Sequence, residues 1–241
     1  MERLDKVLAN SGYGSRRDVK KLVKAALVEV DGEIVKSSDI QVDIKTSEIL
    51  IKGEQLVYKK YVYYIMNKPE GVVSATFDNY DKTVIDLLTP YDASFNPFPV
   101  GRLDKDTVGL LMLTNDGEMN HRLISPRWHV NKVYYAEIDN FVDEEDIKAF
   151  KDGIILDDEY KCMPAVLKII SSDVEMSKVE VVVQEGKFHQ VKRMFIARGK
   201  EVVYLRRVKF GPISLDESLK EGEYRELSEP EIEVLKGLHQ I

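Results

Sequence analysis

The fold is decided by one stretch of the sequence, Pro99-Val-Gly-Arg-Leu-Asp-Lys-Asp-Thr-Val-Gly-Leu-Leu-Met-Leu-Thr-Asn-Asp-Gly117. Its second half, residues 108–113, is an apolar run that ends at an Asn-Asp-Gly turn signal, so it predicts a buried strand. Just before this strand, Arg-Leu-Asp-Lys-Asp places four charges within residues 102–106. A loop anchored by a core strand holds its polar side chains in fixed positions, which suits a reacting carboxylate.

Asp104 and Asp106 have two interpretations. An arbitrary Asp in such a loop most often hydrogen-bonds nearby backbone amides. The order of residues favours chemistry instead, because Gly-Arg-Leu-Asp-x-Asp-Thr-x-Gly-Leu-Leu closely resembles the catalytic motif of pseudouridine synthases, in the branch that modifies ribosomal RNA. The resemblance implies that Asp104 is the nucleophile. It also implies that Arg102 holds the flipped nucleotide or fills the position that the nucleotide leaves.

The composition indicates a globular protein with two unequal domains. The chain has 241 residues, of which 44% are hydrophobic, enough for a substantial core. It has no run of eighteen apolar residues and starts with charges, so we expect neither secretion nor a membrane partner. The single Cys162 excludes an internal disulfide, and the four scattered histidines show no metal-ligand spacing. We therefore expect a reduced, cytoplasmic protein with no metal and no cofactor.

The distribution of charge favours an RNA partner although the net charge is −7. Binding to phosphates is driven by positive charge, so the sum alone argues against nucleic acid. Residues 1–30, however, carry seven Lys/Arg against four Asp/Glu, and residues 186–210 carry eight against one. Acidic residues gather at 137–159 and 211–235. This segregation predicts two basic surfaces on an acidic body, although either basic run taken alone is equally an ordinary solvated face.

Residues 1–58 predict a small αβ domain. Apolar residues at helical spacing indicate a first helix near residues 4–8, and Ser15 with Asp18 three residues later opens a second, basic helix. Short strands follow at residues 28–30, 34–35 and 49–51, the first two joined by an Asp-Gly turn.

This N-terminal pattern resembles the RNA-binding domain first described in ribosomal protein S-four. The resemblance is carried by Arg-Leu-Asp-Lys-Val-Leu-Ala, Gly-Ser-Arg-Arg and Val-Glu-Val-Asp-Gly. In that family the basic second helix contacts the RNA backbone, a contact that positions the substrate without reading its sequence. An inert basic helix is the alternative. The residues assigned to RNA binding here are Arg3, Arg16, Arg17 and Lys20.

Residues 59–241 form the second predicted domain, and further motifs in it resemble the same synthase family. Lys-Pro-x-Gly after a Tyr-rich strand at 61–66 resembles the first motif, which is chiefly architectural. Lys-Val-Tyr-Tyr-Ala, which enters a strand at residue 132, is similar to the tyrosine motif. That similarity places Tyr134 in the pocket, stacked on uracil or acting as base for a sugar proton; without it, a strand Tyr is a packing residue. Alternation along the strand puts Tyr134 and Tyr135 on opposite faces.

A third motif is the sequence Glu-Gly-Lys-Phe-His-Gln-Val-Lys-Arg-Met-Phe of residues 185–195. It resembles the family segment in which a basic residue pairs with the catalytic Asp, a role that falls on Lys192, with Arg193 as second candidate. Burial under RNA disfavours a charged carboxylate, so Asp104 needs such a cation nearby. We expect a helix over residues 187–199, ended by its glycine. The residues of this segment assigned to RNA are Lys187, His189, Gln190 and Arg193.

The remaining pattern predicts helices near 118–124 and 143–151 and after Ser228, and strands near 165–170, 179–184, 202–205, 206–210 and 222–225. Together with the resemblance this implies an α+β fold: a small N-terminal αβ RNA-binding domain, then a pseudouridine-synthase catalytic domain with a mixed, largely antiparallel sheet.

The implied activity is the isomerisation of one uridine to pseudouridine, with the base flipped out of the RNA. This reaction needs no redox change or group donor, which agrees with a sequence that has no dinucleotide-binding or Walker loop. Asp104 either attacks the sugar or assists removal of a neighbouring sugar proton, and the sequence leaves both routes open.

Asp106 and the Ser-Pro-Arg of residues 125–127 most resemble the branch that acts on 16S ribosomal RNA. We expect a monomer whose partner is this RNA, either naked or in a small-subunit assembly intermediate. A 23S ribosomal RNA synthase and a non-catalytic RNA-binding ribosome-assembly factor are the alternatives. A glycoside hydrolase using Asp104 and Asp106 is disfavoured, because two loop residues so close in sequence rarely reach the opposed spacing of roughly 5–9.5 Å.

Overall fold

The computed structural model describes all residues except 45, 57 and 239–241. The chain divides into two compact units: Met1–Val62 with Leu88–Pro97, and Tyr63–Leu87 with the chain from Phe98 onward. The domain boundary expected between residues 58 and 59 stays a prediction. None of the described helices is long and apolar enough to cross a bilayer.

The first unit contains the two predicted helices and a small sheet. The order of the four-stranded sheet is β3-β2-β5-β6. Ser15 and Asp18 form the expected capping box of the second helix, α2, each accepting a hydrogen bond from the other's backbone amide. The elements are α1 (Leu4–Asn10), α2 (Arg16–Lys24), α3 (Pro90–Ser94), β1 (Glu2–Arg3), β2 (Val28–Val30), β3 (Glu33–Ile34), β4 (Gln41–Val42), β5 (Ile49–Ile51) and β6 (Glu54–Gln55).

Helix α2 ends in a strained residue. The amides of Ala26 and Leu27 donate to the carbonyls of Val23 and Leu22, which are the two hydrogen bonds of a Schellman motif. That motif requires a left-handed residue, and Ala26 has a φ of 56°. A side chain in this region is disfavoured, so the position suits glycine better than alanine.

Replacing Ala26 with glycine should therefore stabilise the first unit by about 0.5–1 kcal/mol, the strain relief less the entropy cost of glycine. Native-state hydrogen exchange of the amides in α2 measures this change. The matched control is Ala25→Gly: Ala25 has a φ of −80°, so glycine there should destabilise. Equal exchange in the two variants would contradict the assignment of strain to Ala26.

The second unit is built on a nine-stranded sheet in the order β11-β12-β10-β13-β9-β7-β15, with β14 beside β13 and β8 beside β9. Among the described strands of this sheet every pairing is antiparallel except that of β13 with β9. The predicted mixed, largely antiparallel sheet is thus confirmed. The strands are β7 (Tyr63–Lys68), β8 (Phe98–Pro99), β9 (Val108–Thr114), β10 (Lys132–Asp139), β11 (Val166–Ser172), β12 (Ser177–Val183), β13 (Glu201–Phe210), β14 (Ile213–Ser214) and β15 (Tyr224–Glu226).

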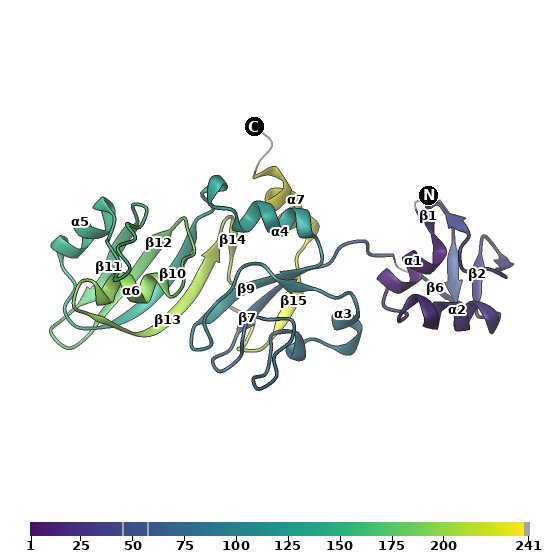
Figure 1. Cartoon of the computed structure of the whole chain (residues 1–241), viewed down its shortest axis with the longest axis horizontal. Helices are drawn as coiled ribbons and strands as arrows, with labels where there is room; N and C mark the ends of the chain where they lie inside the picture. Colours follow the sequence, from purple (N-terminus) through teal and green to yellow (C-terminus); the bar gives the residue numbers. More distant parts are fainter. Residues whose placement is uncertain (45, 57, 239–241) are drawn as a thin grey trace. The chain divides into compact units, whose positions relative to one another are not determined.

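Helices cover the two halves of this sheet separately (Figure 1). The helices α5 (Glu144–Asp152) and α6 (Gln190–Ile196) pack against β10 to β13. Their residues Phe150 and Phe195 belong to the apolar core of this half. The helices α4 (Gly117–Ile124) and α7 (Glu229–Gly237) accompany β7 and β9 around a second core. The capping residues predicted for α4, α5 and α7, which are Asp116, Asp143 and Ser228, are confirmed.

The parallel pairing of β9 with β13 is the shortest along the path from β11 to β15. It consists of two residue pairs, Val108 with Arg206 and Gly109 with Arg207. Gly109 has a φ of 99°, and a Cβ atom there would lie 2.4 Å from the carbonyl oxygen of Arg207. The buried Arg207 crosses the junction and donates from Nε to the carbonyl of Leu110 at 2.7 Å. The glycine in the motif is therefore required by the close approach of two backbones.

Two elements differ from the prediction. The helix expected over residues 187–199 is shorter, because His189 has a φ of 48° and so cannot belong to a right-handed helix; α6 begins at Gln190. The strands expected at 202–205 and 206–210 are one continuous strand, β13. This strand pairs with β10 on one side and with β9 on the other, and these two neighbours decide which of its residues are buried. The sequence of the strand does not reveal which neighbours it has.

Candidate active site

Two buried polar side chains form hydrogen bonds with the backbone of the loop that carries Asp104. The Ser74 hydroxyl donates to the carbonyl of Leu103 at 2.9 Å and accepts from its amide at 3.0 Å. Lys68, at the end of β7, donates from Nζ to the carbonyls of Lys105 and Thr107. Burial lowers the pKa of Lys68 to about 8. These bonds fix the backbone on both sides of Asp104, which agrees with the architectural role expected for the first motif.

The carboxylate of Asp104 lies between two basic groups. Lys192 Nζ, from α6, is 3.6 Å from one carboxylate oxygen, and His189 Nε2 is 3.5 Å from the other. Lys192 also donates to Asp106 at 2.5 Å. Asp104 is 29% exposed and Asp106 63% exposed, so the first faces the pocket and the second faces solvent. The sequence-predicted pairing of Lys192 therefore involves both carboxylates.

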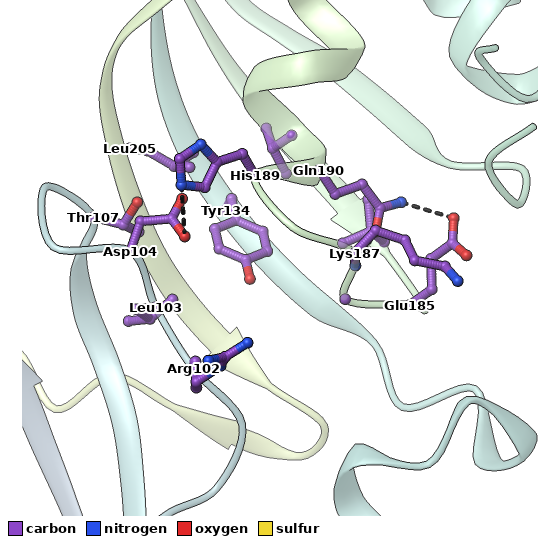
Figure 2. Close-up of a pocket in the computed structure, with 13 residues that line it drawn as sticks. Arg102, Leu103, Asp104, Thr107, Tyr134, Glu185, Lys187, His189, Gln190 and Leu205 are labelled. Carbon is purple, nitrogen blue, oxygen red and sulfur yellow. Dashed lines mark hydrogen bonds and ion pairs between the residues drawn. The ribbon is translucent and has the colours of Figure 1, made fainter. Parts of the chain in front are cut away.

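A small pocket of about 70 Å³ opens beside Asp104. Figure 2 shows Tyr134, from β10, between the Asp104 loop and the segment that leads into α6. Tyr135 points to the opposite face of β10, as predicted, and donates its hydroxyl to Glu137. Thr107 also lines the pocket, and its buried hydroxyl has no hydrogen-bond partner among the described residues. A ligand in the pocket would meet an aromatic ring, a carboxylate and a free hydroxyl.

Glu185 organises the wall of the pocket, a role that sequence reasoning missed. It is 4% exposed and accepts hydrogen bonds from the Tyr160 hydroxyl, the Met163 amide and the Gln190 side chain. The hydrogen bond to Glu185 raises the pKa of Tyr160 to about 12. The available signal is the Glu-Gly pair that opens the third motif.

Two residues expected to contact RNA are engaged within the protein. Gln190 is 5% exposed, donates to Glu185 at 2.8 Å and accepts from the Lys187 amide at 3.0 Å. Arg193 pairs with Asp157 and Asp158, and it is Lys192 that lies beside Asp104. The polar groups of Gln190 and Arg193 thus already have partners within the protein, which argues against contacts of these two side chains with RNA.

The other predicted residues keep exposed side chains. Arg102 is exposed at the pocket mouth and has no hydrogen-bond or ion-pair partner among the described residues. Lys187 lies over the ring of Tyr160, with Nζ 4.2 Å from the ring centre. In the first unit Arg3 pairs with the buried Asp5. The exposed face of α2 carries Arg16, Arg17 and Lys20.

No group of three or more His, Cys, Asp or Glu in the described part of the chain is arranged to hold a metal ion. The pocket offers a carboxylate beside two basic side chains and an aromatic ring. These are the groups that the sequence motifs led us to expect.

Comparison with known proteins assigns this site to a family. Residues 62–197 match the sequence profile of RNA pseudouridylate synthases, more than half of the chain, and residues 2–46 match the S4 domain. The chain belongs to the RNA pseudouridylate synthase family. Like other RNA pseudouridylate synthases it is an isomerase, and its N-terminal segment is an S4 domain.

Full-length relatives support the assignment to the RNA pseudouridylate synthases. An uncharacterised RNA pseudouridine synthase of Bacillus subtilis is 49% identical over 97% of this chain and 98% of its own. The ribosomal small subunit pseudouridine synthase A of Haemophilus influenzae is 39% identical over 97% and 99%. The crystal structure of a pseudouridylate synthase superposes with a TM-score of 0.68 at 38% identity, covering 98% of this chain and 100% of that one. The predicted family, fold class and enzyme class are confirmed.

The ribosomal large subunit pseudouridine synthase B of Bacillus subtilis is also similar, with 36% identity over 99% of this chain and 97% of its own length. Relatives named for two different ribosomal subunits thus align along nearly the whole of this chain.

Two buried lysines in this synthase give a pH dependence of stability. Burial lowers the pKa of both Lys68 and Lys132 to about 8, against 10.5 for an ordinary lysine. Between pH 8 and 10.5 the unfolded chain therefore binds protons that the folded chain does not, so these groups make stability rise with pH.

Lys132→Met should reduce that rise, because it removes one of the two groups. Urea unfolding at pH 8 and pH 10, followed by the fluorescence of the single Trp128, measures the difference. Burial raises the pKa of Cys162 to about 11, so this thiol makes stability fall as the pH rises. Its contribution is the same in the variant and in the wild type. Identical changes in stability for variant and wild type would show that Lys132 stays charged in the fold.

Proposed function

We propose that this chain converts a uridine of 16S ribosomal RNA into pseudouridine, with Asp104 as the catalytic carboxylate. The observation that carries the proposal is the position of Asp104, at the wall of one pocket with Tyr134 and within 4 Å of Lys192 and His189. The reaction breaks the bond from sugar C1′ to base N1 and forms one from C1′ to C5 of the same base. It therefore needs a charged carboxylate at the sugar and a surface that retains the free uracil.

Asp104 acts in one of two ways in this proposal. Its carboxylate attacks C1′ and releases the uracil anion, or it assists loss of the sugar proton on C2′ to give a glycal. In both routes the ammonium group of Lys192 offsets the negative charge of the carboxylate once RNA excludes water, and His189 Nε2 lies 3.5 Å from its second oxygen. Tyr134 stacks on the uracil, which holds the ring while it turns to present C5, and in the second route it serves as the alternative base.

Asp106 has a separate part in the proposal. Its hydrogen bond to Lys192 is shorter than the distance from Lys192 to Asp104. Asp106 thus holds the ammonium group in place without closing a tight ion pair on the reacting carboxylate, which would make it a poorer nucleophile. Arg102, exposed at the pocket mouth, is proposed to hold the flipped nucleotide or replace it in the RNA stack.

Further RNA contacts are proposed for Lys187 and His189, which line the pocket in the second unit, and for Arg3, Arg16, Arg17 and Lys20 in the S4 domain. All lie on segments with excess positive charge, and contacts of this kind supply affinity that falls with salt. The S4 domain is proposed to span residues 1–58 and the catalytic domain residues 59–241. We propose that the protein works as a cytoplasmic monomer on naked RNA or on an assembly intermediate.

Asp104→Asn should abolish product formation, by more than about a thousandfold, and leave RNA affinity within a few-fold, because the amide keeps the shape but loses the charge. Tritium release from 16S ribosomal RNA labelled at uridine C5 measures turnover, and filter binding measures affinity. Asp139→Asn, an exposed carboxylate at the other end of β10, is the matched control. Turnover by Asp104→Asn above a few per cent of wild type would refute the assignment.

The choice of 16S over 23S ribosomal RNA is tested separately. The relative from Haemophilus influenzae carries a small-subunit name and the Bacillus subtilis synthase B a large-subunit name; the second Asp of the motif, Asp106, favours the first. A strain lacking this protein should lose one pseudouridine from 16S ribosomal RNA, mapped by chemical modification and primer extension. Loss from 23S ribosomal RNA instead would support the alternative, and loss from neither would favour a non-catalytic assembly factor.

A further inference from the structure

A second, larger cavity adjoins the pocket, and most of the residues that line it have no part in the proposed mechanism. It is a groove of about 930 Å³ that shares Arg102, Asp104 and His189 with the small pocket. Its volume lies in the range of about 300–1,000 Å³ that is typical of ligand sites, whereas the small pocket alone is below that range. Because the two cavities share these lining residues, whatever enters the groove lies next to the substrate at Asp104.

Two exposed phenylalanines line this groove. Phe77 is 74% exposed and Phe188 is 72% exposed, and they come from segments more than a hundred residues apart in the sequence. Phe188 stacks on His189, with ring centres 3.8 Å apart and planes within 16°. A single exposed phenylalanine needs no explanation, but two at the rim of one groove indicate a binding surface.

Phe77 is held in its exposed position by the loop that carries it. Val73 and Val84 close the stem of this loop through backbone bonds, and Asp78 accepts from the amides of Tyr80 and Asp81 at 2.9 Å. The loop is tied to the Asp104 loop at two points. These are the Ser74 hydrogen bonds to Leu103 and the ion pair of Asp81 with Lys105 at 2.6 Å. The ring of Phe77 is therefore fixed relative to Asp104 instead of being free to bury itself.

The charges of the groove fit an RNA chain. Arg102, Lys105 and Lys187 line it, and of its two carboxylates Asp78 is already occupied by its own backbone and Asp104 is the proposed catalytic group. Flat apolar rings beside cations are how proteins hold unpaired nucleotides, with bases on the rings and phosphates at the cations. A protein partner would not account for the continuity of this groove with the uridine pocket.

The geometry points to a binding site for the unpaired nucleotide next to the target uridine, whose base stacks on Phe77 with Phe188 as the facing platform. This inference rests on the proposed function, because it takes the substrate at Asp104 to be RNA. It defines the substrate class more closely: the target uridine has at least one neighbour whose base is unstacked from the RNA and available to the enzyme.

The test uses the full chain and a synthetic RNA that spans the uridine mapped in the deletion strain. The RNA is made complete and with an abasic site on either side of the uridine. Binding is measured by fluorescence anisotropy and turnover by tritium release. Phe77→Ala should weaken binding of the complete RNA by roughly 5- to 150-fold, the effect of losing one stacked base, and the loss should fall mainly on KM. Phe77→Tyr should restore binding, whereas Phe77→Leu, which is apolar but not aromatic, should not.

Removing the stacked base from the RNA should reproduce the effect of removing the ring. On one of the two abasic RNAs, Phe77→Ala should then bind within twofold of wild type. Phe141→Ala, a 46% exposed phenylalanine outside the groove, is the matched control and should leave binding and turnover unchanged. Equal affinities of Phe77→Ala and Phe141→Ala for the complete RNA would overturn the inference, as would equal losses on all three RNAs. A wild-type chain that binds the RNA without releasing tritium would refute the proposed function while the affinities still decide the role of Phe77.

Discussion

The site depends on the junction at which β9 and β13 run parallel. Only two residue pairs form this junction, and it requires Gly109, because any side chain there would overlap the carbonyl of Arg207. Arg207 then bridges the two strands through its bond to Leu110. The junction joins two halves of a sheet that have separate cores, and it brings the Asp104 loop, which precedes β9, beside β10 and α6. Catalytic groups from distant parts of the sequence meet because two backbones approach this closely.

Buried hydrogen bonds, more than ion pairs, give the site its shape. Lys68 and Ser74 fix the loop backbone around Asp104, and Glu185 holds the wall opposite through three donors. A buried polar group that is fully bonded resists displacement, since breaking one of its bonds leaves an unsatisfied group out of water. The reacting carboxylate can therefore stay only loosely paired, at 3.5–3.6 Å from His189 and Lys192, without losing its position. A tight pair would hold it as firmly but would also neutralise it.

Hydrogen bonding within the protein also distinguishes the residues that support the site from the residues that face it. Gln190 and Arg193 carry the polar groups one expects of RNA ligands, yet their bonds are made within the protein. Arg102 and the hydroxyl of Thr107 have no partner among the described residues and lie at the pocket. Side chains left unbonded at a cavity are the ones available to a substrate, so the division of roles follows from which donors and acceptors remain open.

The sequence by itself determined the elements whose signals lie within a few residues of each other. The capping boxes at Ser15 and Asp143, the buried strand β9 and the opposite faces of Tyr134 and Tyr135 all follow from spacings of one to four positions, where local geometry leaves little choice. The motif around Asp104 likewise indicates the family from its residues alone.

Only the tertiary structure decided which partners those residues have. The bonds of Glu185 to Tyr160 and Met163, the ion pairs of Arg193 with Asp157 and Asp158 and the groove lined by Phe77 each join segments far apart in the chain. Such contacts are chosen by packing and by competition among many possible donors and acceptors, and no local spacing encodes the outcome of that competition.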